Sequence, residues 1–77
     1  NPFNPATTIR YGLSARSHVT LTIFDAVGQR VAELVNSEVE AGNHVVQFSA
    51  QSLASGLYFC RLEAGSFRDT KKLLLLR

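Results

Sequence analysis

The chain has 77 residues, 45% of them hydrophobic, and a formal net charge of +2. A chain of this length forms one small domain with a modest core, and its apolar content is too high for a disordered tail. The single cysteine excludes an internal disulfide, and no apolar stretch reaches the roughly 18 residues of a membrane-spanning helix. Half of the basic residues lie beyond residue 67, and this basic tail gives little support for nucleic-acid binding.

The chain opens on Asn1-Pro2-Phe3-Asn4-Pro5, where two prolines exclude regular secondary structure. Residues 1–6 are therefore predicted to form an extended entry segment. The abrupt start favours a fragment of a longer secreted protein, with residues 1–77 as its single C-terminal domain.

After this segment, alternation of apolar and polar residues predicts short β-strands. The third of them is the least regular, because the spacing of Val31, Leu34 and Val35 also fits a helix. A bulged strand is preferred there because a hairpin turn precedes it. In chain order, the predicted strands are Thr7–Leu13, His18–Asp25, Gln29–Val35, His44–Ser49, Gly56–Glu63 and Phe67–Leu76.

Glycine-containing turns separate most of these strands. The stretch Asp25-Ala26-Val27-Gly28 predicts a hairpin in which Gly28 supplies a positive φ. Residues 50–55 are small and polar, as expected of a loop that crosses between two sheets. The fold class is therefore all-β, a small immunoglobulin-like β-sandwich of about six to seven antiparallel strands.

No constellation for catalysis, cofactor binding or metal binding is found, and the chain is predicted not to be an enzyme. The six acidic residues lie mostly in turns or at outward strand positions, which leaves no paired carboxylates for glycoside hydrolysis. His18 and His44 begin strands and are expected to be exposed. Cys60 lies on the apolar face of its strand, which predicts a buried, inert thiol.

Tyr58 lies two residues before Cys60, a spacing similar to the tyrosine corner of immunoglobulin domains. Its hydroxyl is predicted to close the loop at residues 50–55, with ligand binding as the alternative. Phe24, Leu57 and Phe59 fall on the strand faces opposite the predicted core. They indicate either a docking surface or a face that packs on a neighbouring domain, and the sequence leaves both open.

The chain ends in TKKLLLLR, residues 70–77. As a strand, this stretch places Leu73 and Leu75 on one face and Leu74 and Leu76 on the other. One pair can serve the core while the other stays available to a partner. Lys71 and Lys72 are the charged residues expected beside an exposed aliphatic edge, although solubility alone also explains them.

Four stretches, taken together, resemble the C-terminal sorting domains of the type IX (Por) secretion system, type A. They are NPFNPATTI at residues 1–9, DAVGQRV at 25–31, ASGLYFCRL at 54–62 and KKLLLL at 71–76. The expected immunoglobulin-like fold is also similar to that of flagellar hook-capping proteins.

The resemblance implies a non-catalytic signal that directs a secreted cargo protein through the outer-membrane type IX machinery to the surface of a Gram-negative bacterium. It implies outer-membrane secretion proteins and surface sortase-like proteins as partners, a cargo domain N-terminal to the chain, and removal of the domain with surface anchoring as one outcome. A monomer without nucleic acid, cofactor or transmembrane span is expected. The alternative is a structural or carbohydrate-adhesive accessory module of a surface enzyme.

The resemblance also assigns roles to residues. Recognition by the translocon or sortase is assigned to Lys71, Lys72, Leu73, Leu74, Leu75 and Leu76. The structural motif comprises Pro2, Asn4, Pro5, Gly28, Gly56 and Tyr58. Cys60 has no counterpart in the pattern.

Overall fold

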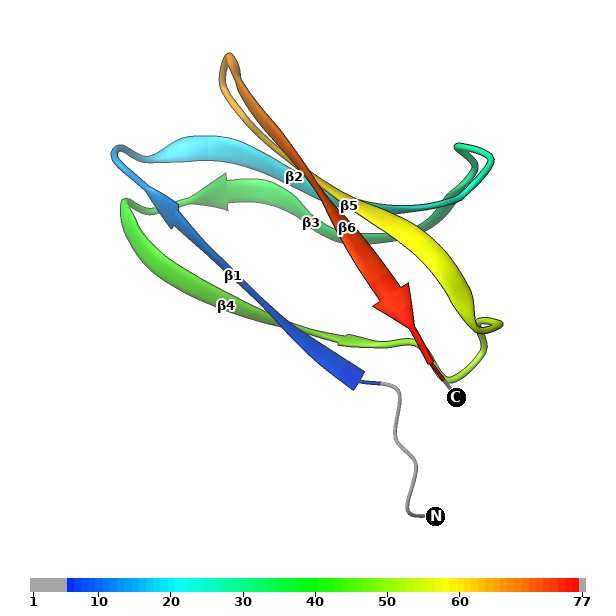
Figure 1. Ribbon diagram of the computed structural model, residues 1–77. Helices are drawn as coiled ribbons and strands as arrows, with labels where there is room; N and C mark the ends of the chain where they lie inside the picture. The colour runs from blue at the N-terminus through cyan, green and yellow to red at the C-terminus, as the bar shows by residue number, and fades with distance from the viewer. Residues whose placement is uncertain (1–5, 77) are drawn as a thin grey trace.

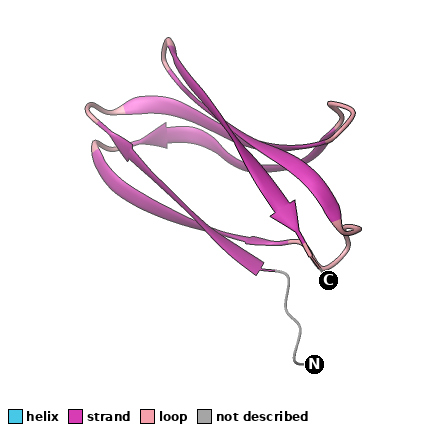
Figure 2. Cartoon of the chain, in the orientation of Figure 1, coloured by secondary structure: helices cyan, strands magenta, loops and turns pink. Residues whose placement is uncertain are grey.

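The computed structural model describes residues 6–76, which form six antiparallel strands in two sheets. The predicted entry motif with Pro2, Asn4 and Pro5 lies outside the described residues. The strands are β1 (Ala6–Leu13), β2 (Ser17–Asp25), β3 (Arg30–Val39), β4 (Gly42–Ser49), β5 (Gly56–Ala64) and β6 (Phe67–Leu75). The ribbon is built from strands and short connections throughout this part of the chain (Figure 2). Among these residues, no helix has the length and hydropathy for a membrane crossing.

The two sheets differ in width. One contains β1 and β4 only, and the other has the strand order β3-β2-β5-β6 (Figure 1). The all-β sandwich is confirmed, with a strand count at the lower end of the predicted range. Because a two-stranded layer faces a four-stranded layer, part of the wider sheet has no strand opposite it.

The core follows from the alternation in β2. Val19, Leu21 and Ile23 are its fully buried large side chains, as the sequence predicts. Ile23 joins a cluster contributed by both sheets and by the β4–β5 loop, whose other buried members are Phe48, Ala50, Tyr58 and Leu75. Residues at alternating positions of a strand share one face, so this cluster fills the space between the sheets.

The irregular apolar spacing in β3 is explained by two shifts in its register with β2. The shifts leave Leu34 and Val31 as extra residues, one at each break in the pairing. Both side chains are half-buried and pack against the core cluster. Bulges therefore produced the helix-like spacing, and the preference for a bulged strand is confirmed.

The predicted end of this third strand was wrong. β3 extends to Val39 rather than Val35, because residues 36–38 continue the pairing with the first residues of β2. These three residues are Asn36, Ser37 and Glu38, all exposed. This edge segment has polar side chains on both faces. It therefore lacks the alternation of apolar and polar residues by which a strand is predicted from sequence.

The β2–β3 hairpin turn has the predicted chemistry. The backbone N–H of Gly28 donates to the Asp25 carbonyl at 3.0 Å, and Gly28 has a φ of 88°. The Asp25 carboxylate accepts bonds from the backbone N–H groups of Val27 at 3.1 Å and Gln29 at 2.8 Å. A residue with a Cβ would be strained at this φ, so glycine is required at position 28.

Candidate functional site

The last strand, β6, lies at the edge of the wider sheet. Within residues 6–76 it pairs only with β5, from Ala64 opposite Phe67 to Gly56 opposite Leu75. The outer edge of such a strand presents backbone N–H and C=O groups that can pair with a strand of another protein. β6 is drawn in orange to red in Figure 1, where it forms one margin of the wider sheet.

The terminal leucines alternate between core and solvent. Leu75 is 6% exposed and belongs to the core cluster, and the half-buried Leu73 packs against that cluster. Leu74 and Leu76 are 68% and 67% exposed. The predicted division of the four leucines into two pairs is confirmed, so this end of the chain is anchored through one face while the other face remains free.

The outward leucine of β6 lies beside the apolar residues that the sequence placed on the outer face. Leu74 pairs with Leu57, and Phe59, two residues further along β5, pairs with Phe24 on β2. Phe24, Leu57, Phe59 and Leu74 are here called the outer apolar patch. The guanidinium of Arg61 lies over the Phe24 ring, 4.5 Å from its centroid, and covers part of the patch. Leu57 and Leu74 are left exposed at its end.

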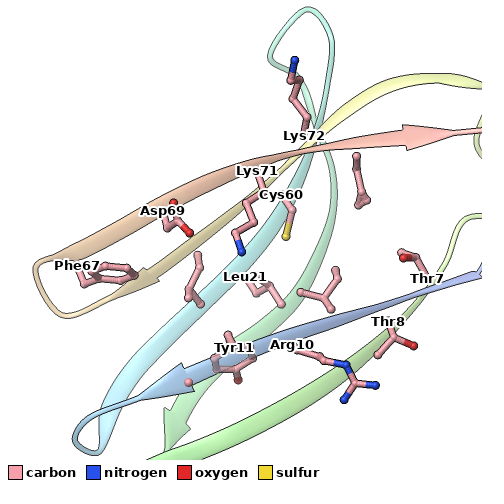
Figure 3. A pocket seen from close by; sticks show the side chains of 14 residues that line it. Thr7, Thr8, Arg10, Tyr11, Leu21, Cys60, Phe67, Asp69, Lys71 and Lys72 are labelled. Carbon is pink, nitrogen blue, oxygen red and sulfur yellow. The ribbon is translucent and has the colours of Figure 1, made fainter.

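The two lysines of the terminal motif lie on different surfaces of the molecule. Lys71 pairs with Cys60, and Lys72 pairs with Phe59, so the adjacent lysines stand on opposite faces of β6. Figure 3 shows the Lys71 amine pointing between the sheets toward β1, whereas the Lys72 amine points away. Sequence reasoning treated them as one pair, and the structure separates them.

A groove between β1 and the β5–β6 hairpin was missed by the sequence analysis. It measures about 620 Å³. One wall is β1, over residues 7–12, and the other carries Leu21, Cys60, Leu62 and the inward side of β6 (Figure 3). The available signal was the polarity of Asp69 and Lys71, which occupy inward positions of a strand. Inward polar side chains indicate that no sheet covers them.

Tyr58 closes the β4–β5 loop as predicted. It is buried, and its hydroxyl donates to the Ala54 carbonyl at 2.8 Å. Gly56, two residues before it, has a φ of 154° at the start of β5. The bond ties the loop that crosses between the sheets to the strand that follows it.

Cys60 differs from its prediction, because it is only half-buried. Its strand face is the apolar one, but at this position the face borders the groove rather than the closed core. Partial burial raises the pKa of the thiol; the nearby Lys71 opposes this shift, and Asp69 adds to it. The protonated thiol is thus favoured, and a neutral thiol is a poor nucleophile.

The two histidines form local contacts. The His18 ring lies 2.8 Å from the side-chain oxygen of Asn36, and the His44 ring donates to the Glu40 carbonyl at 2.7 Å. His44 also stands against the ring of Tyr11, with centroids 5.4 Å apart. Across residues 6–76, no three His, Cys, Asp or Glu side chains gather as a metal site.

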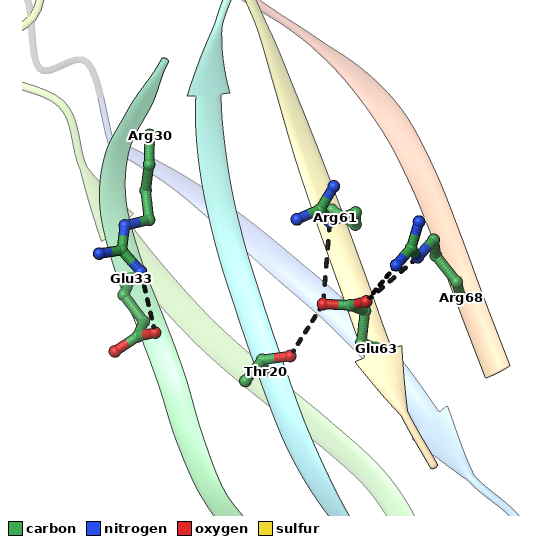
Figure 4. A network of polar contacts seen from close by, with 6 residues as sticks. All are labelled: Thr20, Arg30, Glu33, Arg61, Glu63 and Arg68. Carbon is green, nitrogen blue, oxygen red and sulfur yellow. Dashed lines mark hydrogen bonds and ion pairs between the residues drawn. The ribbon is translucent and has the colours of Figure 1, made fainter. Parts of the chain in front are cut away.

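Glu63 organises a polar network on the outer face (Figure 4). Its carboxylate accepts two bonds from Arg68, at 2.7 and 3.1 Å, and one from the Thr20 hydroxyl at 3.3 Å, and it lies 3.8 Å from Arg61. The hydrogen bond from Arg68 is the main cause that lowers the pKa of Glu63. Because these partners hold the carboxylate in its charged form, the network is a structural feature of the β5–β6 hairpin.

Comparison with known proteins links this geometry to one family. The family model described as the secretion system C-terminal sorting domain matches residues 1–76. Comparisons with curated proteins and with solved structures found no match. The family match covers both sheets, the terminal motif and the entry motif.

Proposed function

Since the chain belongs to the family of secretion system C-terminal sorting domains, a sorting signal for type IX secretion, we propose that β6 and the outer apolar patch together form the surface that the secretion machinery reads. The family assigns secretion through the type IX system to the bacterial cell surface. It favours this role over that of a structural or carbohydrate-adhesive module.

One observation carries the proposal: the terminal leucines are divided between core and solvent. Leu75 holds β6 against the cluster, so the exposed Leu74 is presented on an ordered strand. An ordered strand loses less conformational entropy on binding than a loose tail does. Its free edge supplies backbone bonds for affinity, and its outward side chains supply specificity.

Neighbouring side chains support the same surface. Leu57 adds apolar area directly beside Leu74 across the β5–β6 pairing. Lys72 lies on the same outer face, next to Phe59. We assign recognition to this outward set, whereas Leu73 and Leu75 act by holding the strand in place. Lys71 faces the groove and is not needed for this contact.

The rest of the proposal follows the family. The partners are outer-membrane secretion proteins and surface sortase-like proteins of a Gram-negative bacterium. The cargo is a protein domain joined N-terminally to the chain, which would make residues 1–77 the C-terminal module of a longer secreted protein. The domain itself is proposed to have no enzymatic activity and to act as a monomer.

The test is an export assay in a bacterium with a type IX system, using a reporter cargo fused to the chain. Leu74→Asp places a charge on the exposed docking face without touching the core, so the surface-exposed fraction of the cargo is expected to fall at least about tenfold. Val45→Asp is the matched control, because Val45 is an exposed valine on the other sheet.

Both variants must first show the same thermal unfolding as the parent chain. Normal export of the Leu74→Asp cargo would contradict the proposal. Equal loss of export in both variants would also contradict it, because the signal would then not reside on β6.

A further inference from the structure

The inner face of the wider sheet is uncovered at one end. Phe67 occupies an inward position of β6 opposite the buried Ala64, yet it is 57% exposed. Asp69 and Lys71 follow it at the next inward positions, and all three line the groove. The layer that should cover them is β1–β4, which has two strands where the facing sheet has four.

The wall of this groove is a strand edge. In the part of the chain that the structure describes, β1 pairs with β4 along one edge and has no strand on the other. Residues 7–12 of β1 run along the groove, so the backbone N–H and C=O groups on this edge need hydrogen-bond partners when covered. An apolar small molecule would bury these groups without partners, whereas an extended peptide would pair with them. The chemistry of the edge therefore favours a peptide strand.

The charged side chains of the groove also indicate which peptide strand would fit it. The charged side chains at the inward positions of the groove are Lys71 and Asp69, whereas Arg10 and Lys72 line its rim with their charged ends pointing away from it (Figure 3). The Lys71 amine points into the groove toward β1 (Figure 3). A strand that carries a carboxylate opposite this amine is complementary to it.

We infer that this groove accepts one extended strand of a partner protein, which pairs with the free edge of β1 and becomes the third strand of the narrow sheet. Its inward side chains are apolar at alternate positions, against Leu21, Leu62 and Tyr11, and one inward position carries a carboxylate that faces Lys71. This surface is separate from the proposed sorting surface, which uses the outer face and outer edge of β6.

The test uses two synthetic peptides as long as β1, eight residues. Both alternate threonine and valine, and they differ at one valine position, which carries glutamate in the first and lysine in the second. Cys60 reports occupancy, because it is the sole cysteine and borders the groove. The alkylation rate of Cys60 by the neutral reagent iodoacetamide is measured with and without each peptide at millimolar concentration.

The glutamate peptide is expected to slow alkylation several-fold, and the lysine peptide to have a weaker effect. Lys71→Glu is expected to weaken the glutamate peptide about threefold to tenfold and to strengthen the lysine peptide. Each rate is compared with the peptide-free rate of the same variant, since Lys71 also influences the pKa of the Cys60 thiol. Arg30→Glu, the same reversal on exposed Arg30 of β3, should change neither response.

Two results would overturn the inference. If neither peptide slows alkylation, the groove takes no added strand, as when another segment of the chain already fills it. If both peptides act equally and Lys71→Glu changes nothing, the carboxylate has no role. Because the assay uses the purified chain, it succeeds or fails independently of the export assay.

Discussion

The two ends of β6 lie over very different surroundings, although they belong to one strand of one sheet. Near its end, Leu75 is enclosed by Ile23, Phe48 and Tyr58, because the narrow sheet and the β4–β5 loop cover it. At its start, Phe67 has the same inward orientation but no covering strand among the described residues. Inward orientation alone therefore does not bury a side chain in a sandwich whose layers differ in width. The closed end supplies stability, and the open end leaves a groove.

Truncating one apolar side chain at each end gives the largest expected contrast. Leu75→Ala should lower the free energy of unfolding by about 2–5 kcal/mol, because it removes buried atoms and leaves a cavity. Phe67→Ala should cost about 1 kcal/mol or less, because most of that ring is already exposed. Urea denaturation of both variants measures the difference. Equal losses would mean that the open end is closed in solution.

A smaller change at the closed end concerns a single hydrogen bond. Tyr58→Phe removes the bond from the Tyr58 hydroxyl to the Ala54 carbonyl and should cost about 0.5–1.5 kcal/mol. Tyr11→Phe is the control. It also removes a tyrosine hydroxyl, but at the edge of the groove, where it is the Tyr11 ring that contacts His44. Tyr58→Phe should therefore unfold at a lower urea concentration than Tyr11→Phe. If they coincide, the hydroxyl does not hold the loop.

The smallest effect is expected at the open end and depends on pH. The pKa of Glu63 is lower in the folded chain than its ordinary value of 4.5, chiefly because Arg68 donates to it. Its contribution to stability is therefore present above pH 4.5 and is lost as the pH falls through the folded pKa. Glu63→Gln should show a shallower loss of stability on acidification, and chemical denaturation between neutral pH and pH 3 measures it.

The control for that prediction is Asp69→Asn, at an exposed position of β6 on the face opposite to Glu63. If Glu63→Gln and the parent chain lose stability in parallel over this range, the Arg68 contact does not persist in solution. In that case, Glu63 does not stabilise the β5–β6 hairpin.

Much of the closed end could be predicted from the sequence, because its features are local. Alternation in β2 indicated Val19, Leu21 and Ile23 as core. The spacing before Cys60 indicated the role of Tyr58, and the terminal alternation divided the four leucines into two pairs, of which the structure shows Leu73 and Leu75 to be the inward one. Each inference needs only a strand and its period, which the sequence displays directly.

The open end could not be predicted, because it depends on which strands pair. The exposure of Cys60 and the groove itself follow from β1 having β4 as its partner, whereas the opposite orientation of Lys71 and Lys72 follows from strand alternation alone. The residues of β1 do not by themselves indicate which strand pairs with it. The roles assigned to Lys71–Leu76 as a recognition motif remain predictions, as do those of Pro2, Asn4 and Pro5.

The pairing of β1 with β4 also has a consequence for the rate of folding. Ala6 pairs with Ser49, whereas the β2–β3 and β5–β6 pairs join neighbours in the chain. The two hairpins can form early, but the narrow sheet requires closure of a loop that contains both β2 and β3. Folds dominated by such distant pairings reach the native state in milliseconds to seconds rather than microseconds. The narrow sheet, and with it one wall of the groove, should therefore form after the two hairpins.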